Sequence, residues 1–227
     1  MHVQYKTRTQ YVGNKGYFHG SEYLILRDEF FSYRKTEFRK KINESPSKVL
    51  VMMGGSDPAN LTVRALKDLQ TSEKCLDIVI VTGAGYRYRA ELERCVKESK
   101  HTVSLYSNVN VDELLHLMKQ ADIGVVHYGI TALEMACVGL PFVSIAHNSE
   151  EYYENRLVEC GFCLDAGLCD TLRQGDISSC LNKLLRDKKL CEQLSKKGMD
   201  SVDGKGLIRV ADLMISLLKE KTKKITV

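Results

Sequence analysis

The sequence has no long apolar run. No window approaches the roughly 20 consecutive uncharged apolar residues that are needed to cross a bilayer. Residues 1–10 also lack an apolar stretch of signal-peptide length. We therefore expect a protein without a membrane span, located in the cytoplasm.

The sequence also has no strong excess of either positive or negative charge. The formal net charge is +4 and the isoelectric point is about 8.5. This mild basic balance fits an anionic ligand, but it falls short of the basic surface of a nucleic-acid binder. The one basic run, residues 219–224, is typical of a solvated chain end.

The sequence contains no complete set of cysteines and histidines at the spacing of a metal site. Cys160 and Cys163 have the spacing of a ligand pair, but neither a second such pair nor suitably spaced histidines accompany them. Cys137, Cys180 and Cys191, like Cys160, have apolar neighbours on predicted helices. We expect reduced, buried thiols, with neither a metal nor a cofactor.

What the sequence does contain is a regular alternation of strands and helices after residue 47. Apolar residues make up 44% of the 227 residues, enough for one large domain or one domain with an appendage. The predicted strands are 48–53, 76–82, 101–106, 123–127, 142–146 and 162–164, and the predicted helices are 61–70, 89–98, 111–120, 130–138, 150–159, 176–187 and 205–221. Buried strands that alternate with helices predict an α/β fold with a doubly wound, Rossmann-like parallel sheet.

The loop after the first predicted strand, residues 54–60, has the features of an anion site. Gly54 and Gly55 let backbone N–H groups approach a phosphate, and Ser56 adds a hydroxyl donor. Either Asp57 or Asn60 can cap the following helix. The loop is neither a Walker loop nor a GxGxxG fingerprint, which disfavours adenine dinucleotides. A tight turn with a helix cap is the alternative interpretation.

A second candidate loop precedes the helix predicted at 130–138. Gly129 frees the backbone there, and Thr131 adds a hydroxyl. Glu134 lies one turn into the helix, where a carboxylate can accept hydrogen bonds from two ribose hydroxyls. The alternative is a solvated glutamate that interacts with the helix dipole. Residues 147–150, after the fifth strand, either cap the next helix or face the same crevice.

Taken in order, these motifs resemble the C-terminal domain of GT-B-type sugar-nucleotide enzymes. They are most similar to the branch that contains the pseudaminic-acid-pathway UDP-sugar hydrolase and the spore-coat polysaccharide protein SpsG (the PseG/SpsG family). The matching segments are 54–58, 60–62, 108–109 with the helix 112–118, 121–122, 129–134, 139–141 and Asn148, and residues 23–30 resemble the segment that joins the two domains of that family.

The resemblance implies a UDP-sugar ligand. It places the diphosphate at Gly54, Gly55, Ser56, Asp57, Asn60, Gly129, Ile130 and Thr131, the ribose at Glu134, the uracil near Asn108 and Val109, and the sugar near His147 and Asn148. It also implies an inverting, metal-independent reaction in which water attacks the anomeric carbon and UDP leaves. The substrate implied is a UDP-deoxy-diacetamido sugar of nonulosonic acid or surface polysaccharide biosynthesis.

The sequence departs from the family pattern at both loops. The usual Gly-Gly-Ser-Thr is Tyr-Gly-Ile-Thr at 128–131, and the usual Asn-Gln is Asn-Ser at 148–149. The family also carries an N-terminal domain whose glycine-rich first loop holds a catalytic histidine. His2 and His19 lie in no matching motif, so no catalytic residue is assigned.

These departures set the expected domain organisation. We expect residues 1–45 to be a linker or remnant that joins an N-terminal domain not present in this chain, and residues 46–227 to be the nucleotide-sugar-binding domain with C-terminal helices. Activity then needs a partner domain or partner chain that supplies the base. One alternative is the donor-binding half of a GT-B glycosyltransferase. Another is a non-catalytic nucleotide-sugar-binding module.

Overall fold

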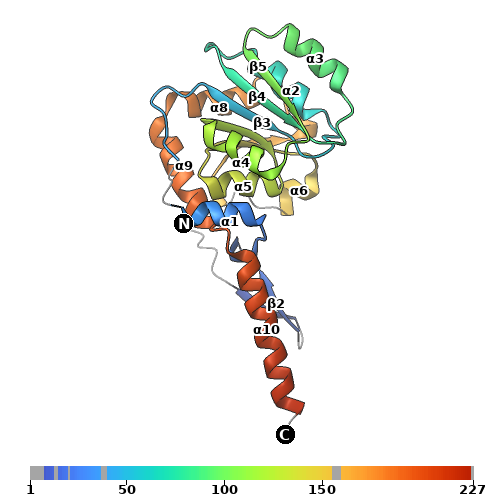
Figure 1. Cartoon of the computed structure of the whole chain (residues 1–227). Coiled ribbons are helices and arrows are strands. Elements are labelled where there is room, and N and C mark those ends of the chain that lie inside the picture. Colours follow the sequence, from blue (N-terminus) through green and yellow to red (C-terminus); the bar gives the residue numbers. More distant parts are fainter. Residues whose placement is uncertain (1–7, 13–14, 20, 37–39, 155–159, 226–227) are drawn as a thin grey trace.

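The computed structural model describes residues 8–12, 15–19, 21–36, 40–154 and 160–225. Six strands form one parallel sheet in the order β5-β4-β3-β6-β7-β8 (Figure 1). They are β3 (Lys48–Met52), β4 (Asp77–Thr82), β5 (Thr102–Ser107), β6 (Ile123–His127), β7 (Phe142–Ala146) and β8 (Leu164–Leu168). Strand β3, the first of the sheet in the sequence, is central. Strands β4 and β5 extend the sheet on one side of it, and β6, β7 and β8 then extend it on the other, as in dinucleotide-binding folds. The predicted doubly wound Rossmann-like sheet is confirmed.

Helices cover both faces of the sheet because successive side chains of a strand point to opposite faces. Val49 and Val51 face one hydrophobic cluster, and Leu50 between them faces the other. The helices are α1 (Asp28–Lys35), α4 (Val111–Gln120) and α5 (Ile130–Val138) on the Leu50 side, and α2 (Leu61–Leu69), α3 (Arg89–Lys97) and α8 (Asp176–Arg186) on the other. Helix α9 (Lys188–Ser201) begins on this second side and then packs against α5. Both faces are therefore buried, as the apolar strand sequences predict.

The largest differences from the predicted elements lie after β7. The last strand is β8 at Leu164–Leu168, two residues later than the predicted start. The helix predicted at 150–159 is α6 (Ser149–Glu154), and residues 155–159 lie outside the described residues. Helix α9 was not predicted, because its apolar stripe is only Leu190, Cys191 and Leu194 among many charges.

The N-terminal segment, expected to be a linker or remnant, contains regular structure. Strands β1 (Arg8–Val12) and β2 (Lys15–His19) pair antiparallel, and the short 3₁₀ helix η1 (Ser21–Tyr23) follows. Helix α1 packs against α5 with Phe30 fully buried. Sequence periodicity missed α1 because only two of its eight residues are buried.

Helix α10 (Gly206–Ile225) projects away from the sheet (Figure 1), and it contacts the short helix η1. Its start is held by Arg209, which donates to the Asp203 carboxylate and to the Glu22 carbonyl. Six large apolar side chains on the helix are exposed by 44% or more: Leu207, Ile208, Met214, Ile215, Leu217 and Leu218. An apolar surface of this extent is typical of a contact face.

None of the described helices is long and apolar enough to span a bilayer. All eight cysteines lie within the described residues, and each is a thiol. Burial raises the pKa of Cys137 and Cys163 to about 12 and that of Cys191 to about 11, so these thiols stay protonated at neutral pH. No group of three or more metal-ligating side chains occurs in the described part of the chain.

One buried carboxylate joins α2 to α8 and yields a stability prediction. Asp68 of α2 accepts hydrogen bonds from the backbone N–H groups of Gly175 and Ser178, at the start of α8. Asp68→Ala leaves these donors without a partner, so we expect a loss of about 1–2 kcal/mol of unfolding free energy in urea denaturation. The exposed Asp212→Ala is the matched control, with no measurable loss expected. Equal stability of the two variants would contradict the capping role.

Candidate functional site

The candidate site lies where the strand order reverses, between β3 and β6. The first loop (residues 54–60) follows β3, and the second loop (residues 128–131) follows β6. Because Met52 pairs with Val126 in adjacent parallel strands, the two loops leave the sheet side by side. Open α/β sheets bind ligands at this position, beyond the carboxyl ends of the strands.

The imidazole of His127, the last residue of β6, lies between the two loops. A Cβ atom added to Gly54 would come within 2.7 Å of Cε1 of the ring, and one added to Gly129 within 2.8 Å of Nε2. Gly129 has an extended backbone (φ 165°) that any residue can adopt, so its need for glycine is steric. Gly54 additionally has a positive φ of 82°.

Gly55 occupies the open part of the first loop. Nothing lies within 4 Å of a Cβ added at this position, and its φ is not in the left-handed region. The loop is braced from behind by the glycines that follow β4: Gly85 donates its N–H to the Gly55 carbonyl at 3.0 Å, and Gly83 packs directly against the Gly55 backbone. The fold of the chain therefore does not require glycine at position 55. A ligand that contacts the backbone there would require it, because a side chain would occupy the same space.

Asp57 and Asn60, both expected at the diphosphate, have partners within the chain. The buried Asp57 carboxylate accepts hydrogen bonds at 2.8 Å from the N–H groups of Leu61 and Thr62, which caps α2. The Asn60 side chain donates to Glu91 and accepts from Tyr86. The negative charge of Asp57 already occupies the start of α2, so this helix offers little attraction to another anion.

The start of α5 is open instead. Its N-cap is Gly129, and no side chain among the described residues caps its first turn. Ile130 is 61% exposed, and Thr131 is half-buried beside it. The uncapped N–H groups and the helix dipole thus point their partial positive charge into the crevice. Of the two helices that begin at the crevice, α5 rather than α2 has donors available for a phosphate.

Glu134 is not a solvated first-turn residue. Only 1% of its side chain is exposed, and its two carboxylate oxygens accept from Arg27, Oε1 from Nε at 2.8 Å and Oε2 from Nη2 at 2.9 Å. Burial raises the pKa of Glu134, and the neighbouring Arg27 opposes this effect. Arg27, which the sequence analysis did not single out, lies just before α1.

His147, expected near the sugar, lies next to His127 at the carboxyl end of β7. The two ring centroids are 4.7 Å apart, and both residues are half-buried. The neighbouring Asn148 is exposed, and its carbonyl accepts the N–H of Tyr152. His127 was not among the predicted site residues, because Gly54 and Gly129 were attributed to phosphate binding alone. A histidine that ends a strand directly before a glycine loop was the available signal.

Asn108 and Val109, expected near the uracil, follow β5 at the far side of the crevice. Asn108 is exposed with a positive φ of 53°, and Val109 packs on the core. A cavity of about 180 Å³ lies at the adjacent carboxyl ends of β4 and β5, lined by residues that include Thr82, Gly83, Tyr86, Tyr106 and Ser107. Whole ligands of drug size occupy about 300–1,000 Å³, so this cavity has room for only part of a nucleotide sugar.

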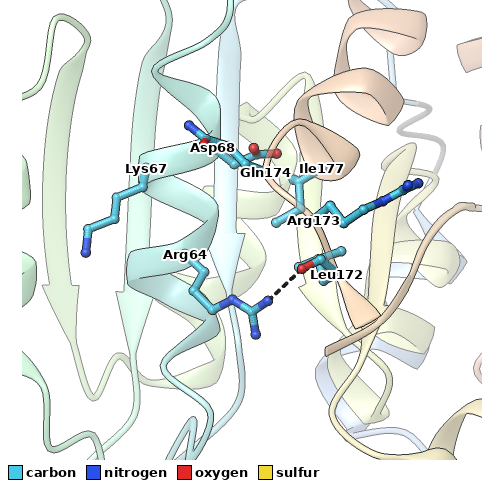
Figure 2. A pocket seen from close by; sticks show the side chains of 7 residues that line it. All are labelled: Arg64, Lys67, Asp68, Leu172, Arg173, Gln174 and Ile177. Atoms are coloured by element: carbon cyan, nitrogen blue, oxygen red, sulfur yellow. Dashed lines mark hydrogen bonds between the residues drawn. The ribbon is translucent and has the colours of Figure 1, made fainter. Parts of the chain in front are cut away.

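A second cavity, of about 280 Å³, lies between α2 and the start of α8 (Figure 2). Its lining includes three cations, but Arg64 donates to the carbonyls of Cys169 and Leu172, and Lys67 and Arg173 pair with Glu91 and Asp176. Its carboxylate, Asp68, caps α8. These side chains hold the helices together, so the crevice at β3 and β6 is the candidate site.

The six-stranded parallel sheet with flanking helices is that of a Rossmann-like half of a GT-B-type fold. The chain belongs to the family described as glycosyl transferases group 1, whose sequence profile matches residues 34–200.

Relatives in sequence and in structure agree with this assignment. The spore coat polysaccharide biosynthesis protein SpsG of Bacillus subtilis is 27% identical over 219 residues, 95% of this chain and 63% of SpsG. MurG of Acinetobacter baumannii superposes with a TM-score of 0.61 at 14% identity, over 82% of this chain and 53% of MurG. The UDP-GlcNAc 2-epimerase of Neisseria meningitidis, solved with UDP-GlcNAc, has a TM-score of 0.57 at 15% identity, over 77% and 45%. The chain therefore spans less than two thirds of the length of each relative.

The position of His127 generates a testable coupling. Gly129→Ala forces a methyl group against the imidazole, so we expect it to cost about 1–3 kcal/mol of unfolding free energy. His127→Ala removes the obstacle, and Gly129→Ala should then cost much less in that background. Urea denaturation of the two single variants and the double variant measures the coupling. Additive losses would show that the ring does not set the glycine requirement.

Proposed function

We propose that this chain binds a UDP-sugar as the donor-nucleotide half of an inverting, metal-independent sugar-nucleotide hydrolase. The observation that carries the proposal is the open backbone at Gly55, which is braced by Gly83 and Gly85 in the loop after β3, the strand next to the one that leads into the uncapped start of α5. Two sets of N–H groups then meet a diphosphate without a side chain in the way. The structural relative solved with UDP-GlcNAc supports this ligand class.

In the proposed reaction the chain stabilises the leaving group. Backbone donors at Gly54, Gly55, Ser56 and the first turn of α5 hold the diphosphate while negative charge develops on it. The same contacts fix the position of the anomeric carbon. Water attack further needs a base within hydrogen-bond reach, and we propose that the other half of the enzyme supplies it.

We propose that this other half, an N-terminal domain or a partner chain, docks near residues 1–45 and α10. Two observations support the placement. Six large apolar side chains of α10 are exposed, and SpsG, like the other relatives, is longer than this chain. Residues 46–227 would then form the nucleotide-sugar-binding domain. The similarity to SpsG, a spore coat polysaccharide biosynthesis protein, favours a sugar of surface polysaccharides as the substrate class.

A donor-binding half of a glycosyltransferase is the second candidate function. The family description and the structural similarity to MurG favour it. The nucleotide site would be the same, and only the group that attacks the sugar would differ. A non-catalytic nucleotide-sugar-binding module is a third possibility, and it predicts binding without turnover in every combination of partners.

The first prediction of this proposal concerns UDP binding. The wild-type chain should bind UDP in titration calorimetry, and Gly55→Asp should weaken binding at least about tenfold, because its carboxylate points at the diphosphate. Glu134→Ala should also weaken it. Neither space nor backbone conformation opposes a side chain at 55, so Gly55→Asp should keep its melting temperature.

Ser179→Asp, on the exposed side of α8, is the matched control for the added charge and should bind UDP as the wild type does. If the folded wild-type chain shows no UDP binding, or if Gly55→Asp and Glu134→Ala both leave the affinity unchanged, the assignment is wrong.

The second prediction concerns turnover. The chain alone should release no UDP from UDP-sugars, because a bound leaving group without a positioned base leaves most of the barrier in place. Adding an SpsG-type N-terminal domain should restore release, followed by a coupled assay for free UDP. Transfer to an added acceptor, with little release to water, would instead identify a glycosyltransferase half. UDP release by the unaccompanied chain would place the base within these residues.

A further inference from the structure

Strand β5 forms one edge of the six-stranded sheet, and only its inner side is paired in the part of the chain that the structure describes. The N–H groups of Thr102 and Asn108 donate to carbonyl groups at the two ends of β4, at 3.1 and 2.9 Å. The register between them is unbroken. Alternate residues of a parallel strand bond to the same neighbour, so the outward N–H and C=O groups are those of Val103, Leu105 and Ser107.

This outer edge has none of the features that usually protect an edge strand. Residues 102–107 contain neither a charged residue nor a proline, and no bulge interrupts their pairing with β4. The opposite edge strand, β8, carries Asp165, and a register shift interrupts its pairing with β7. Charges, prolines and bulges are the usual means by which proteins prevent another strand from pairing with an edge. Strand β5 is therefore open to a further strand, and its Leu105 and Tyr106 are exposed by 39% and 41%.

We propose that the strand that pairs with β5 is β5 of a second copy of this chain. The two strands run antiparallel around a two-fold axis at Leu105 and join the two six-stranded sheets into one. In this register Leu105 of one copy faces Leu105 of the other, and Val103 faces Ser107. Residues that face each other in this way exchange both of their hydrogen bonds, so the outward N–H and C=O groups of all three are paired. On the other face of the sheet, the two Tyr106 rings are diagonal neighbours within reach of each other.

The charges on either side of β5 favour a second copy in this orientation. The strand itself is uncharged, so pairing with an identical strand brings no like charges together. The segment before it carries Lys97, Glu98 and Lys100, with a net positive charge, and the first turn of α4 after it carries Asp112 and Glu113. Antiparallel pairing places the basic end of one strand beside the acidic end of the other. The two-fold arrangement also uses the open edge of each copy once, so the assembly closes as a dimer.

The inference goes beyond the proposed function, and its test needs no nucleotide. The full chain is examined by analytical ultracentrifugation as wild type, Leu105→Lys, Leu105→Glu and an equal mixture of these two variants. Leu217→Lys is the matched control, because it makes the same change at an exposed leucine of α10, where 48% of the residue is exposed.

The wild type should sediment with twice the 25.7 kDa mass of one chain. Each Leu105 variant should raise the dissociation constant of the dimer at least about a hundredfold, because position 105 meets itself and two like charges then face each other. The mixture should restore the dimer, since lysine then faces glutamate. Leu217→Lys should dimerise as the wild type does.

A proline at the same position provides a second variant that tests the backbone rather than the side chain. Leu105→Pro removes an N–H that points away from β4, so the hydrogen bonds to β4 are kept and the chain should stay folded by circular dichroism. It should be monomeric, because the central pair of hydrogen bonds is lost.

Four results would overturn the inference. The first is a folded wild-type chain that stays monomeric at about 100 µM. The second is dimerisation of the folded Leu105 variants with the affinity of the wild type. The third is dissociation by Leu217→Lys alone, which would make α10 the contact between copies. The fourth is a lysine–glutamate mixture that stays monomeric, because position 105 would then not meet itself.

Discussion

The parallel pairing of β3 with β6 is the constraint on which the crevice depends. About 70 residues separate these strands in the sequence, yet their backbones are hydrogen-bonded from Val49 to Met52. Parallel neighbours end at the same edge of the sheet, so their loops leave together. Each other feature of the site follows from this pairing, including the imidazole between two glycines and the two helix starts that face one crevice.

The two helix starts have opposite electrostatic roles. In α2 the first turn is capped by the carboxylate of its own loop, Asp57. In α5 the first turn is left to solvent, with glycine as its N-cap. A glycine loop before a helix can therefore be a turn whose helix is capped by a side chain, or a site where the helix N–H groups stay available for a ligand. The presence or absence of a capping side chain distinguishes the two. The same distinction applies to the glycines, since those at 54 and 129 make room for His127, whereas nothing in the chain fills the space at 55.

The sequence was sufficient for the sheet, but not for the partners of the candidate-site residues. Short apolar runs predicted the four inner strands well, because their burial leaves a strong local pattern, whereas the more exposed edge strand β8 was predicted two residues early. The pairing of Glu134 with Arg27 joins residues 107 apart, and no local pattern contains it. Helices α1 and α9 were missed for a related reason, since they bury few residues and their stability comes from tertiary contacts.

Helix α10 has a mechanical consequence. Its 20 residues form a rod about 30 Å long, whose first turns are bonded to the segment before α1. Gly206 at its base packs directly against the backbone of Leu24, and Arg209 is bonded to Glu22. The base of α10 is therefore attached to residues 22–24, and Arg27 follows three residues after Leu24. A force applied at the outer end of α10 is thus transmitted to the segment that carries Arg27, the partner of Glu134.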